Sequence, residues 1–577
     1  MENFVAKQYR IAYIVYRIAW RRIGAVLRIS SRAVEQTGGE SRKMIFTLQR
    51  YIFRDAFKVF VLAAVALTLI MSLGSIVRPV QEYGVGPRQA LHLIGFFLPI
   101  GLTFVLPVAA LFATALIYGR LASDNELDAC RASGISLLTL IYPGLALGIM
   151  VAIANLLLSF YVVPAFVRRA ERALKANAKQ ILFRNIQRRG YYKLPPDERY
   201  LIYADQANLQ DSTLFGVVVT EVKGYGIKQI TAAESAKVSF NPHERFNEVR
   251  VTARNTYQVG PEDEGGVFFE WGSFTAEFGS MLGDSIKFNK IDEMKRIRAD
   301  LTRFYPIDKL ARDIHAQFTT ELLAQDIATK IAGDPNNFYT LHSGEKFVEF
   351  TASGVAPREE SVELSGEVVV VESDAASRQR LCTLRCERAV LRIEGNKMAP
   401  TLTMDIYNAR VEGTGYLRMR HIIRGLIRPK AVETITTEFK TEEGSLKAEK
   451  LASALPALQK GASPELKELQ NKLQRKIRGT LARIKAEIHS RLVFGTGCVP
   501  MILIGIGLGI IKKGGHLLSA FGASCVPAAV LIVCIMMGKN ITKNLGSQSI
   551  PGIALMWGGL VLLSLLAVVI YHRLLKN

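Results

Sequence analysis

The sequence lacks the motifs that would let this chain hydrolyse ATP or a peptide or ester bond by itself. It contains no G-x-x-x-x-G-K-[ST], no H-E-x-x-H and no G-x-S-x-G. The fragment nearest to a phosphate loop, "MGKNIT" at 537–542, lacks the upstream glycine and follows a long apolar run. Without that loop the chain cannot cradle the phosphates of ATP. We therefore expect no cofactor on this chain, and we expect any ATP to be bound by a partner subunit.

Metal ligands and disulfide partners are scarce as well. The eight histidines show no metal-ligand spacing. Four of the six cysteines lie in or beside apolar runs, where a thiol behaves as a small hydrophobe. Cys382 and Cys386 lie in "LCTLRC". On a strand they would face the same side about 13 Å apart, at ~3.3 Å per residue, which is too far for a disulfide. We expect two packed thiols there and no metal site.

Charge is missing from six long runs near the two ends of the chain. These runs are Val59–Val77, Leu91–Tyr118, Ile135–Val167, Leu492–Ile511, Leu517–Gly538 and Leu545–Tyr571. Each is close to or above the roughly 20 residues that an α-helix needs to cross the hydrocarbon layer. The sequence therefore predicts six membrane-spanning helices, three on each side of a charged region at 168–491.

The net charge of +22 indicates a membrane partner rather than a nucleic acid. No zinc-knuckle spacing or RNP-like aromatic motif accompanies the basic residues. Cations gather before the first run, at Lys512 and Lys513, and at Arg573 and Lys576, which favours both termini in the cytoplasm and 168–491 outside it. The basic stretch "KQYRIAYIVYRIAWRRIGAVLRI" near the N-terminus has two open interpretations, an amphipathic helix on the anionic leaflet or a disordered extension.

The charged region changes to a period of two, which is typical of β-strands. Strands are expected at 215–224, 236–240, 248–254, 347–354, 362–372, 388–395 and 401–413. A weak repeat pairs "AESAKVSF" and "NEVRVTARNTYQV" with "CERAVLRI" and "PTLTMDIYNARV". Two such copies would suit a stacked β-sandwich or jelly roll, although alternation alone also produces such a repeat. A helical pattern at 306–333 separates the two groups, and an amphipathic helix at 463–492 leads into the fourth run.

A short polar stretch, "SDNELDACRASGIS" at 123–136, joins the second and third runs. Ser123 and Glu126 fit the S-x-x-E capping box, and Gly134 falls where a helix would end at positive φ. About three turns fit between them, and a helix so short is marginal alone. Either the neighbouring spans or another protein should hold it. Glu126 has two open roles, capping the helix or binding a partner.

Three stretches resemble the LptF/LptG family of lipopolysaccharide-export permeases. They are "LPVAALFATALIYGRLASDNELDACRASGIS" (106–136), "MIFTLQRYIFRDAF" (44–57) with "SIVRPVQEYG" (75–84), and "RIKAEIHSRLVFGTGCVPMILIGIGLGI" (483–510). The charged region is longer than the family's usual single jelly roll, and residues 1–43 have no counterpart. The resemblance implies an ABC-type exporter subunit, not an enzyme, that is embedded in the inner membrane and extracts lipopolysaccharide.

The resemblance also implies partners and sites. The partners would be an LptB-like ATPase dimer, a second LptF/LptG-type permease and LptC/LptA-like periplasmic jelly-roll proteins. Family members dock the helix matching 123–134 into the ATPase, which implies a coupling helix with the contact residues Asp124, Glu126, Leu127, Ala129, Arg131, Ala132, Ser133 and Gly134. Arg78 matches a basic residue that contacts the lipid, which implies a phosphate contact here, and a side chain that merely snorkels to the headgroups stays the alternative. Arg168 and Arg169 could extend that phosphate-binding rim, or they could simply form a solvated helix face.

The expected fold is an α-helical membrane protein with six transmembrane helices and a periplasmic all-β domain, resembling a jelly roll or β-sandwich, between helices 3 and 4. The expected division is a basic extension (1–43), helices 1–3 with the coupling helix (44–167), the β domain with its helical insertion (168–462), a connecting helix (463–491) and helices 4–6 (492–577). Two alternatives stay open: a membrane-anchored lipid-binding or scaffold protein, and a lipid-modifying enzyme. The second would need ionisable residues inside the spans, which are nearly absent.

Overall fold

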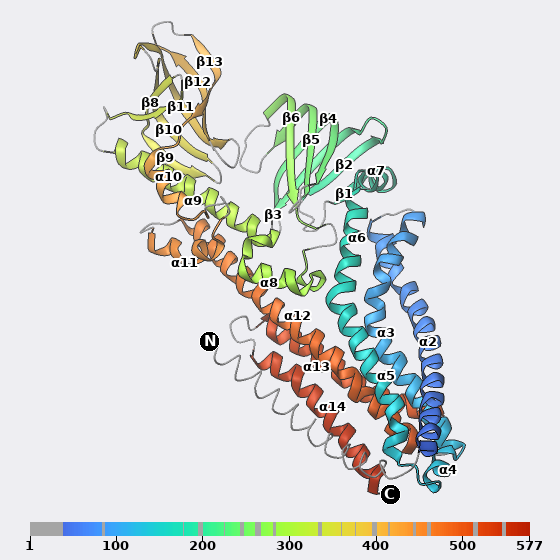
Figure 1. The fold of residues 1–577 in the computed structure, drawn as a ribbon. Helices are drawn as coiled ribbons and strands as arrows, with labels where there is room; N and C mark the ends of the chain where they lie inside the picture. Colours follow the sequence, from blue (N-terminus) through green and yellow to red (C-terminus); the bar gives the residue numbers. More distant parts are fainter. Residues whose placement is uncertain are drawn as a thin grey trace.

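The structure, a computed structural model, places a bundle of long helices at one end and two β-sheets at the other (Figure 1). It describes residues 39–576 apart from short internal segments. These segments are 84–86, 177, 194–199, 224–225, 243–246, 260–266, 281–283, 333–336, 345, 359–360, 375–376, 395–400, 413–415, 442–445, 459–462, 512–516 and 545–549. The basic stretch before residue 39, with its two interpretations, lies outside the described residues.

The N-terminal half of the bundle is built from four consecutive helical elements. They are α2 (Gly39–Tyr83), α3 (Pro87–Ser123), the short α4 (Glu126–Ala132) and α5 (Leu137–Leu157). A π-helical turn, η1 (Leu158–Val162), joins α5 to α6 (Val163–Ala176) without a break. Because η1 keeps the backbone helical, α5, η1 and α6 form one continuous helix, Leu137–Ala176, which contains a candidate membrane span.

The C-terminal half of the bundle consists of α12 (Pro464–Ile511), α13 (Leu517–Asn544) and α14 (Ile550–Lys576). Among the described residues, five helices are long and apolar enough to cross a membrane: Leu98–Ser123, Leu137–Ala176, Pro464–Ile511, Cys525–Asn544 and Ile550–Lys576. The first expected span, Val59–Val77, lies in α2, and its last six side chains are outside the described ones. The count of six spans therefore stays a prediction.

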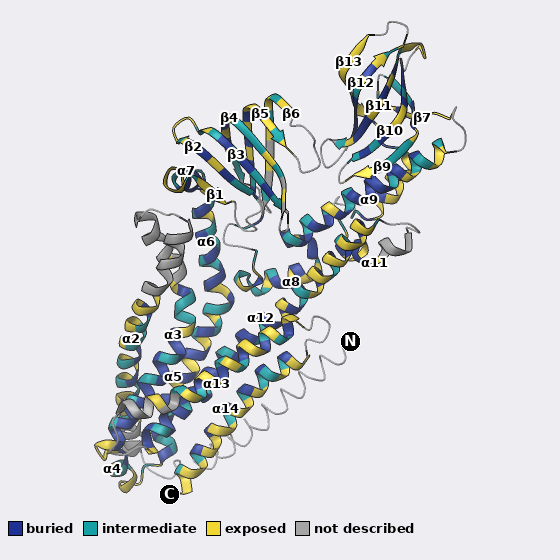
Figure 2. Ribbon diagram, turned by 180° about the vertical axis from the view of Figure 1, so that it is seen from behind, coloured by how far each residue is buried: buried dark blue, intermediate teal, exposed yellow. Residues whose placement is uncertain are grey.

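The outer faces of the bundle are apolar and exposed, as a lipid environment requires. Leu62, Leu69 and Ile70 on α2 are exposed, as are Met536 on α13 and Leu565 on α14 (Figure 2). Inside the bundle, glycines let the helix backbones approach closely. A Cβ on Gly509 of α12 would lie 2.8 Å from the carbonyl oxygen of Ala115 on α3. Small residues at such crossings are typical of membrane helices.

The first sheet follows α6 and α7 (Ala178–Arg189) and is an antiparallel meander with strand order β1-β2-β3-β4-β5-β6. Its strands are β1 (Tyr191–Lys193), β2 (Tyr200–Asn208), β3 (Thr213–Lys223), β4 (Gly226–Pro242), β5 (Asn247–Val259) and β6 (Val267–Phe278). Alternating residues of β5, such as Val249 and Val251, are buried, and α7 covers this face with Leu182 and Ile186.

The second sheet has seven strands in the order β13-β12-β11-β10-β8-β7, with β9 also paired to β10. These strands are β7 (Tyr339–His342), β8 (Lys346–Thr351), β9 (Gly354–Arg358), β10 (Ser361–Asp374), β11 (Arg380–Glu394), β12 (Thr401–Val411) and β13 (Leu417–Leu426). The sheet curls, because the amide of Ile427, just after β13, donates to the carbonyl of His342 in β7 at 2.7 Å. Leu323 and Ile327 of the preceding helix, α9 (Tyr305–Ile331), pack into its apolar core.

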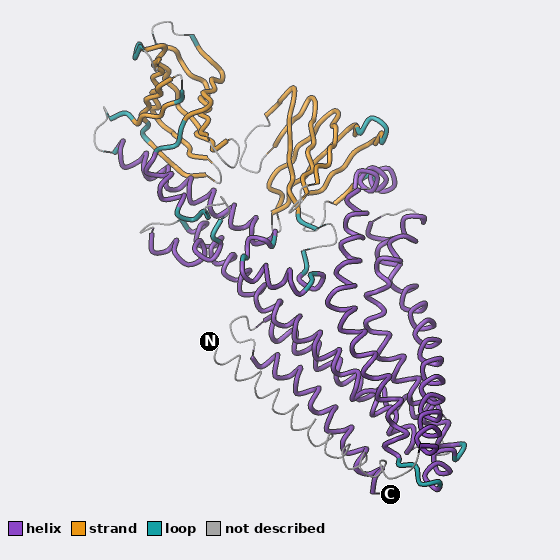
Figure 3. The backbone as a smooth tube through the Cα atoms, in the orientation of Figure 1, coloured by secondary structure: helices purple, strands orange, loops and turns teal. Residues whose placement is uncertain are grey.

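The two sheets are separate, which differs from a single sandwich or jelly roll. The repeated strand pairs fall in different sheets, β4–β5 in the first and β11–β12 in the second (Figure 3). In the first sheet, among the described strands, neighbours are consecutive in sequence, whereas a jelly roll needs crossing connections. Each repeated strand pair bonds to the strands that precede and follow it in the sequence, because a meander needs only short local turns between consecutive strands.

Helices connect the sheets to the bundle. Between the sheets lie α8 (Ile291–Ala299) and α9 (Tyr305–Ile331), so the helix expected at 306–333 is confirmed. After the second sheet come α10 (Lys430–Thr437) and α11 (Ala448–Leu458), which lead into α12. Phe318 of α9, Leu451 of α11 and Leu473 of α12 share one buried core. The amphipathic stretch 463–492 and the fourth span form a single uninterrupted helix, α12.

Candidate coupling loop and lipid-facing cations

The loop between α3 and α5 lies at the end of the bundle opposite the sheets, near the C-terminus (Figure 1). The capping box expected from Ser123 and Glu126 is wrong. Ser123 is the last residue of α3, and α4 begins at Glu126 after Asn125, whose φ of 55° is left-handed and whose side chain makes no capping hydrogen bond. Because α3 extends further than expected, α4 has only 7 residues instead of about three turns.

The C-terminal end of α4 is built as the sequence predicts. Gly134 has a φ of +81°, the left-handed region that glycine adopts without steric cost. The Gly134 amide donates to the Arg131 carbonyl at 3.0 Å, and the Ile135 amide donates to the Cys130 carbonyl at 3.0 Å. This pair of bonds is the Schellman motif. It ends α4 sharply and starts the chain back toward α5.

One side chain anchors α4 to the bundle. Leu127 is only 3% exposed and lies in the same apolar core as Leu121 of α3 and Leu140 of α5. Leu127 therefore serves the attachment of the loop to its own spans. The other seven expected contact residues are exposed: Asp124, Glu126, Ala129, Arg131, Ala132, Ser133 and Gly134. The structure thus leaves seven of the eight predicted residues exposed on and beside α4, and these seven are called the coupling surface after the role predicted for them.

The side chains on and near the coupling surface show no sign of chemical reactivity. Partial burial and the nearby charge of Glu126 raise the pKa of the Cys130 thiol, which keeps it protonated and weakly nucleophilic. Ser133 donates its hydroxyl to the Ala129 carbonyl at 3.0 Å, so this polar side chain is folded back onto α4. Small side chains at Ala129, Ala132 and Ser133 leave the helix backbone accessible to a close partner.

The cations expected to bind lipid phosphate lie toward the sheets. Arg78 is in α2, and its side chain is outside the described ones. Arg168 forms an ion pair with Glu293 of α8, which ties α6 to the segment beyond the first sheet. The guanidinium of Arg169 lies over the ring of Phe166, 5.4 Å from its centroid. Arg168 and Arg169 thus stand on the same turn of α6, and Arg168 already has an acidic partner.

A charged cluster that was not predicted from the sequence lies at this level of the bundle. Arg491 of α12 is 7% exposed and donates to the carbonyls of Lys287 at 2.6 Å and Asn289 at 3.3 Å. It also contacts Glu487 at 3.2 Å, and Glu487 accepts from Lys539 of α13 at 2.6 Å. The only signal in the sequence was the i, i+4 spacing of Glu487 and Arg491. The cluster fastens α12 to α13 and to the segment before α8.

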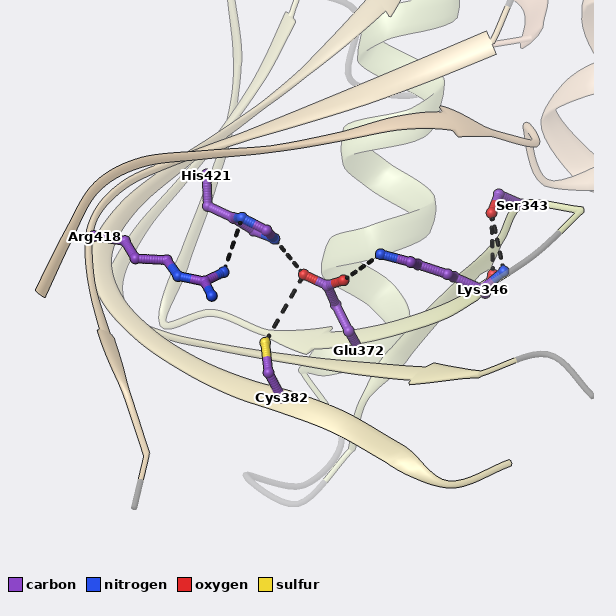
Figure 4. A network of polar contacts seen from close by, with 6 residues as sticks. All are labelled: Ser343, Lys346, Glu372, Cys382, Arg418 and His421. Atoms are coloured by element: carbon purple, nitrogen blue, oxygen red, sulfur yellow. Dashed lines mark hydrogen bonds and ion pairs between the residues drawn. The ribbon is translucent and has the colours of Figure 1, made fainter. Parts of the chain in front are cut away.

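A second polar network closes the curl of the second sheet (Figure 4). Glu372 of β10 is 3% exposed, bonds the ring of His421 on β13 and pairs with Lys346 of β8 at 3.2 Å. Burial alone would raise the pKa of Glu372, but the hydrogen bonds and charges of His421 and Lys346 outweigh it and lower that pKa. Arg418 contacts His421 at 3.3 Å, and the Cys382 thiol lies 4.0 Å from Glu372.

Cys382 and Cys386 are both free thiols on β11, as expected. Burial is the main cause that raises the pKa of each. In the part of the chain that the structure describes, no group of three or more His, Cys, Asp or Glu side chains could hold a metal ion.

A comparison with protein families decides the identity. The model of the lipopolysaccharide export system permease LptF/LptG matches residues 50–276 and 396–573. The chain belongs to the LptF/LptG family. The family is one of membrane-embedded transporter permeases, not of enzymes, and its members work within the Lpt transport system. A comparison with curated proteins found no match.

The match leaves one internal stretch of this LptF/LptG chain uncovered. The unmatched residues 277–395 contain α8, α9 and β7 to β11. The matched parts contain α3, α4, α5 and the first sheet on one side, and α12 to α14 on the other. The second sheet is therefore assembled largely from strands outside the match, β7 to β11, together with β12 and β13 inside it.

Proposed function

We propose that this chain is one permease subunit of an ABC-type exporter that extracts lipopolysaccharide, or a similar phosphorylated glycolipid, from the inner membrane. A separate LptB-like ATPase dimer supplies the energy. A second LptF/LptG-type permease pairs with this chain, and the two together form the cavity that admits the lipid. The observation that supports this most directly is the coupling surface, seven exposed residues held against α3 and α5 by the buried Leu127. Family membership supports the transport class itself.

The proposed orientation places the coupling surface in the cytoplasm and the two sheets in the periplasm. The coupling surface and the C-terminus lie at one end of the bundle, and both sheets lie at the other (Figure 1). Arg573 and Lys576 near the C-terminus fit the cytoplasmic side under the positive-inside rule. ATP turnover would then act at one end of α12 while the sheets are carried at its other end.

The proposed lipid path begins at the cations near the outer ends of the spans. Arg78, Arg168 and Arg169 would contact the phosphorylated head of the lipid, because a guanidinium binds phosphate oxygens in a forked geometry. The acyl chains would pass to the sheets and on to LptC/LptA-like jelly-roll proteins. Leaving those chains in water would cost about 0.8 kcal/mol per CH₂ group, so an apolar path is required.

The test is recovery of the ATPase with variants of the coupling surface. Ala132→Arg places a bulky cation on an exposed position of this surface, and Ala332→Arg makes the same change at an exposed position after α9. We expect the first variant to lose the ATPase on purification from its own membranes and the second to retain it. Normal recovery with Ala132→Arg refutes the coupling role. A wild-type chain that binds no ATPase, yet retains glycolipid, favours the alternative of a membrane-anchored lipid-binding protein.

A further inference from the structure

The first turns of α5 contain a proline that leaves one backbone carbonyl without its helical partner. Pro143 has no N–H, so the carbonyl of Thr139, four residues earlier, cannot be bonded within the helix. The side chain of Gln49 on α2 takes that place, and its amide donates to the Thr139 oxygen at 3.3 Å. A side chain of α2 therefore replaces one backbone hydrogen bond, or rung, of the α5 ladder.

The next rung of α5 is also bonded from outside. The hydroxyl of Tyr118, which is fully buried on α3, donates to the Leu140 carbonyl at 2.8 Å and accepts from the Gly144 amide at 3.1 Å. An uninterrupted helix joins those two backbone groups to each other. Gly144 makes room for this contact, because a Cβ at that position would lie 3.1 Å from the Tyr118 ring.

These two rungs lie directly beside the coupling loop. Ser136 caps α5 by accepting from the Thr139 amide at 3.3 Å, so the carbonyls of these two rungs lie three and four residues after the cap. Tyr118 and Leu140 share the apolar core that holds Leu127, the anchor of α4. On the other side of the bundle, Ile506 of α12 belongs to the same core. The beginning of α5 is thus fixed to α2 and α3 by hydrogen bonds that replace bonds of its own ladder.

Inserted side chains at a helix ladder are a physical cause of local bending. In a regular α5 these backbone groups would bond only to each other, so the helix could shift relative to α2 and α3 without breaking a hydrogen bond. In this chain a shift of the first turns of α5 breaks bonds to both neighbours. Movement applied at α4 is therefore shared by three helices at once.

Building on the proposed function, we propose that Gln49 and Tyr118 are positioning residues of the transport cycle. They couple the start of α5 to α2 and α3, so that displacement of the coupling surface moves the three helices together. Neither residue contacts the ATPase or the lipid in this assignment. Their loss leaves ATP hydrolysis intact while less lipid is moved per ATP hydrolysed.

The experiment uses the complete exporter with its ATPase, reconstituted in vesicles that contain lipopolysaccharide. It measures ATP hydrolysis and lipopolysaccharide release to a soluble jelly-roll acceptor in the same sample. Gln49→Leu removes one hydrogen bond and Tyr118→Phe removes two. Each variant should lower the lipid released per ATP by about fivefold or more, the order of effect of one lost hydrogen bond, with ATPase recovery unchanged. Tyr571→Phe is the matched control, because its hydroxyl donates to the Leu503 carbonyl of α12 at 3.0 Å, outside α5.

A double variant separates positioning from folding. In Gln49→Leu with Pro143→Ala, the new amide at position 143 bonds the Thr139 carbonyl within α5, so the rung is restored without α2. The proposal predicts that thermal stability recovers while the lipid released per ATP stays low. Recovery of the ratio, or an unchanged ratio in both single variants, overturns it. If the wild-type chain recovers no ATPase, or releases lipid without ATP, the proposed function fails instead.

Discussion

The contact between α3 and α12 gives a quantitative test of how the bundle is packed. Gly509→Ala adds a Cβ that lies 2.8 Å from the Ala115 carbonyl oxygen and 3.1 Å from the Gly119 amide nitrogen. Both are backbone atoms and cannot rotate away. The helices must therefore separate by roughly 0.6 Å to reach the shortest ordinary contact of 3.4 Å. Overpacking of this kind costs about 1–3 kcal/mol in the free energy of unfolding.

Gly558→Ala is the matched control for this change. Gly558 lies on α14 with nothing within 4 Å of an added Cβ, so the same substitution should be neutral or stabilise by up to about 1 kcal/mol through helix propensity. The assay is unfolding of the two purified variants in the same detergent, followed by loss of helical circular dichroism. We expect Gly509→Ala to unfold at lower temperature or denaturant concentration than Gly558→Ala. Equal stability of the two variants would refute the close approach of α3 and α12.

Three further changes test other contacts. Gly134→Ala should lower the free energy of unfolding by about 1–2 kcal/mol, because the backbone at position 134 has a left-handed φ. The variant should also recover less ATPase on purification, and full recovery would show that the Schellman motif at the end of α4 is not needed for docking. Because the pKa of Glu372 is lowered in the folded chain, its ion pairing stabilises the second sheet above the ordinary glutamate pKa and is lost as the pH falls below it. Thermal unfolding should show that Glu372→Gln is less stable than the wild type at neutral pH and that this difference in stability shrinks in acid. A difference that does not change with pH would contradict the ion pairing. Lys539→Met should destabilise the bundle by about 1 kcal/mol through loss of its bond to Glu487, and the exposed Lys543→Met on the same helix should not.

Local pattern predicted the elements of this fold well. The alternating stretches at 248–254 and 362–372 lie inside β5 and β10, and the helical pattern at 306–333 corresponds to α9, Tyr305–Ile331. Such signals depend on neighbours a few residues apart, which the sequence shows directly. Strand pairing depends on distant segments, and alternation does not specify which strands meet. That is why a single sandwich, in which two sheets pack against each other, was expected where two separate sheets with their own cores form.

In the candidate site, too, local features were predicted and contacts between distant residues were not. Gly134 at positive φ follows from local chemistry and is confirmed. The capping box at Ser123 was wrong because α3 continues to that residue, so Ser123 ends one helix and does not cap the next. The contact of Arg491 with the carbonyl of Lys287 joins positions 204 residues apart, and the bond from Gln49 to Thr139 joins positions 90 apart. No local pattern indicates such pairs.

The most direct test of the account asks what touches the coupling surface in the membrane. A photo-crosslinking amino acid replaces Ala129, which is exposed on α4, and irradiation is carried out on membranes in which this chain is expressed with its natural partners. The account predicts a covalent adduct with a nucleotide-hydrolysing protein, formed from the cytoplasmic side. An adduct only with periplasmic proteins, or with lipid alone, would contradict the claim that this loop receives the work of a separate motor.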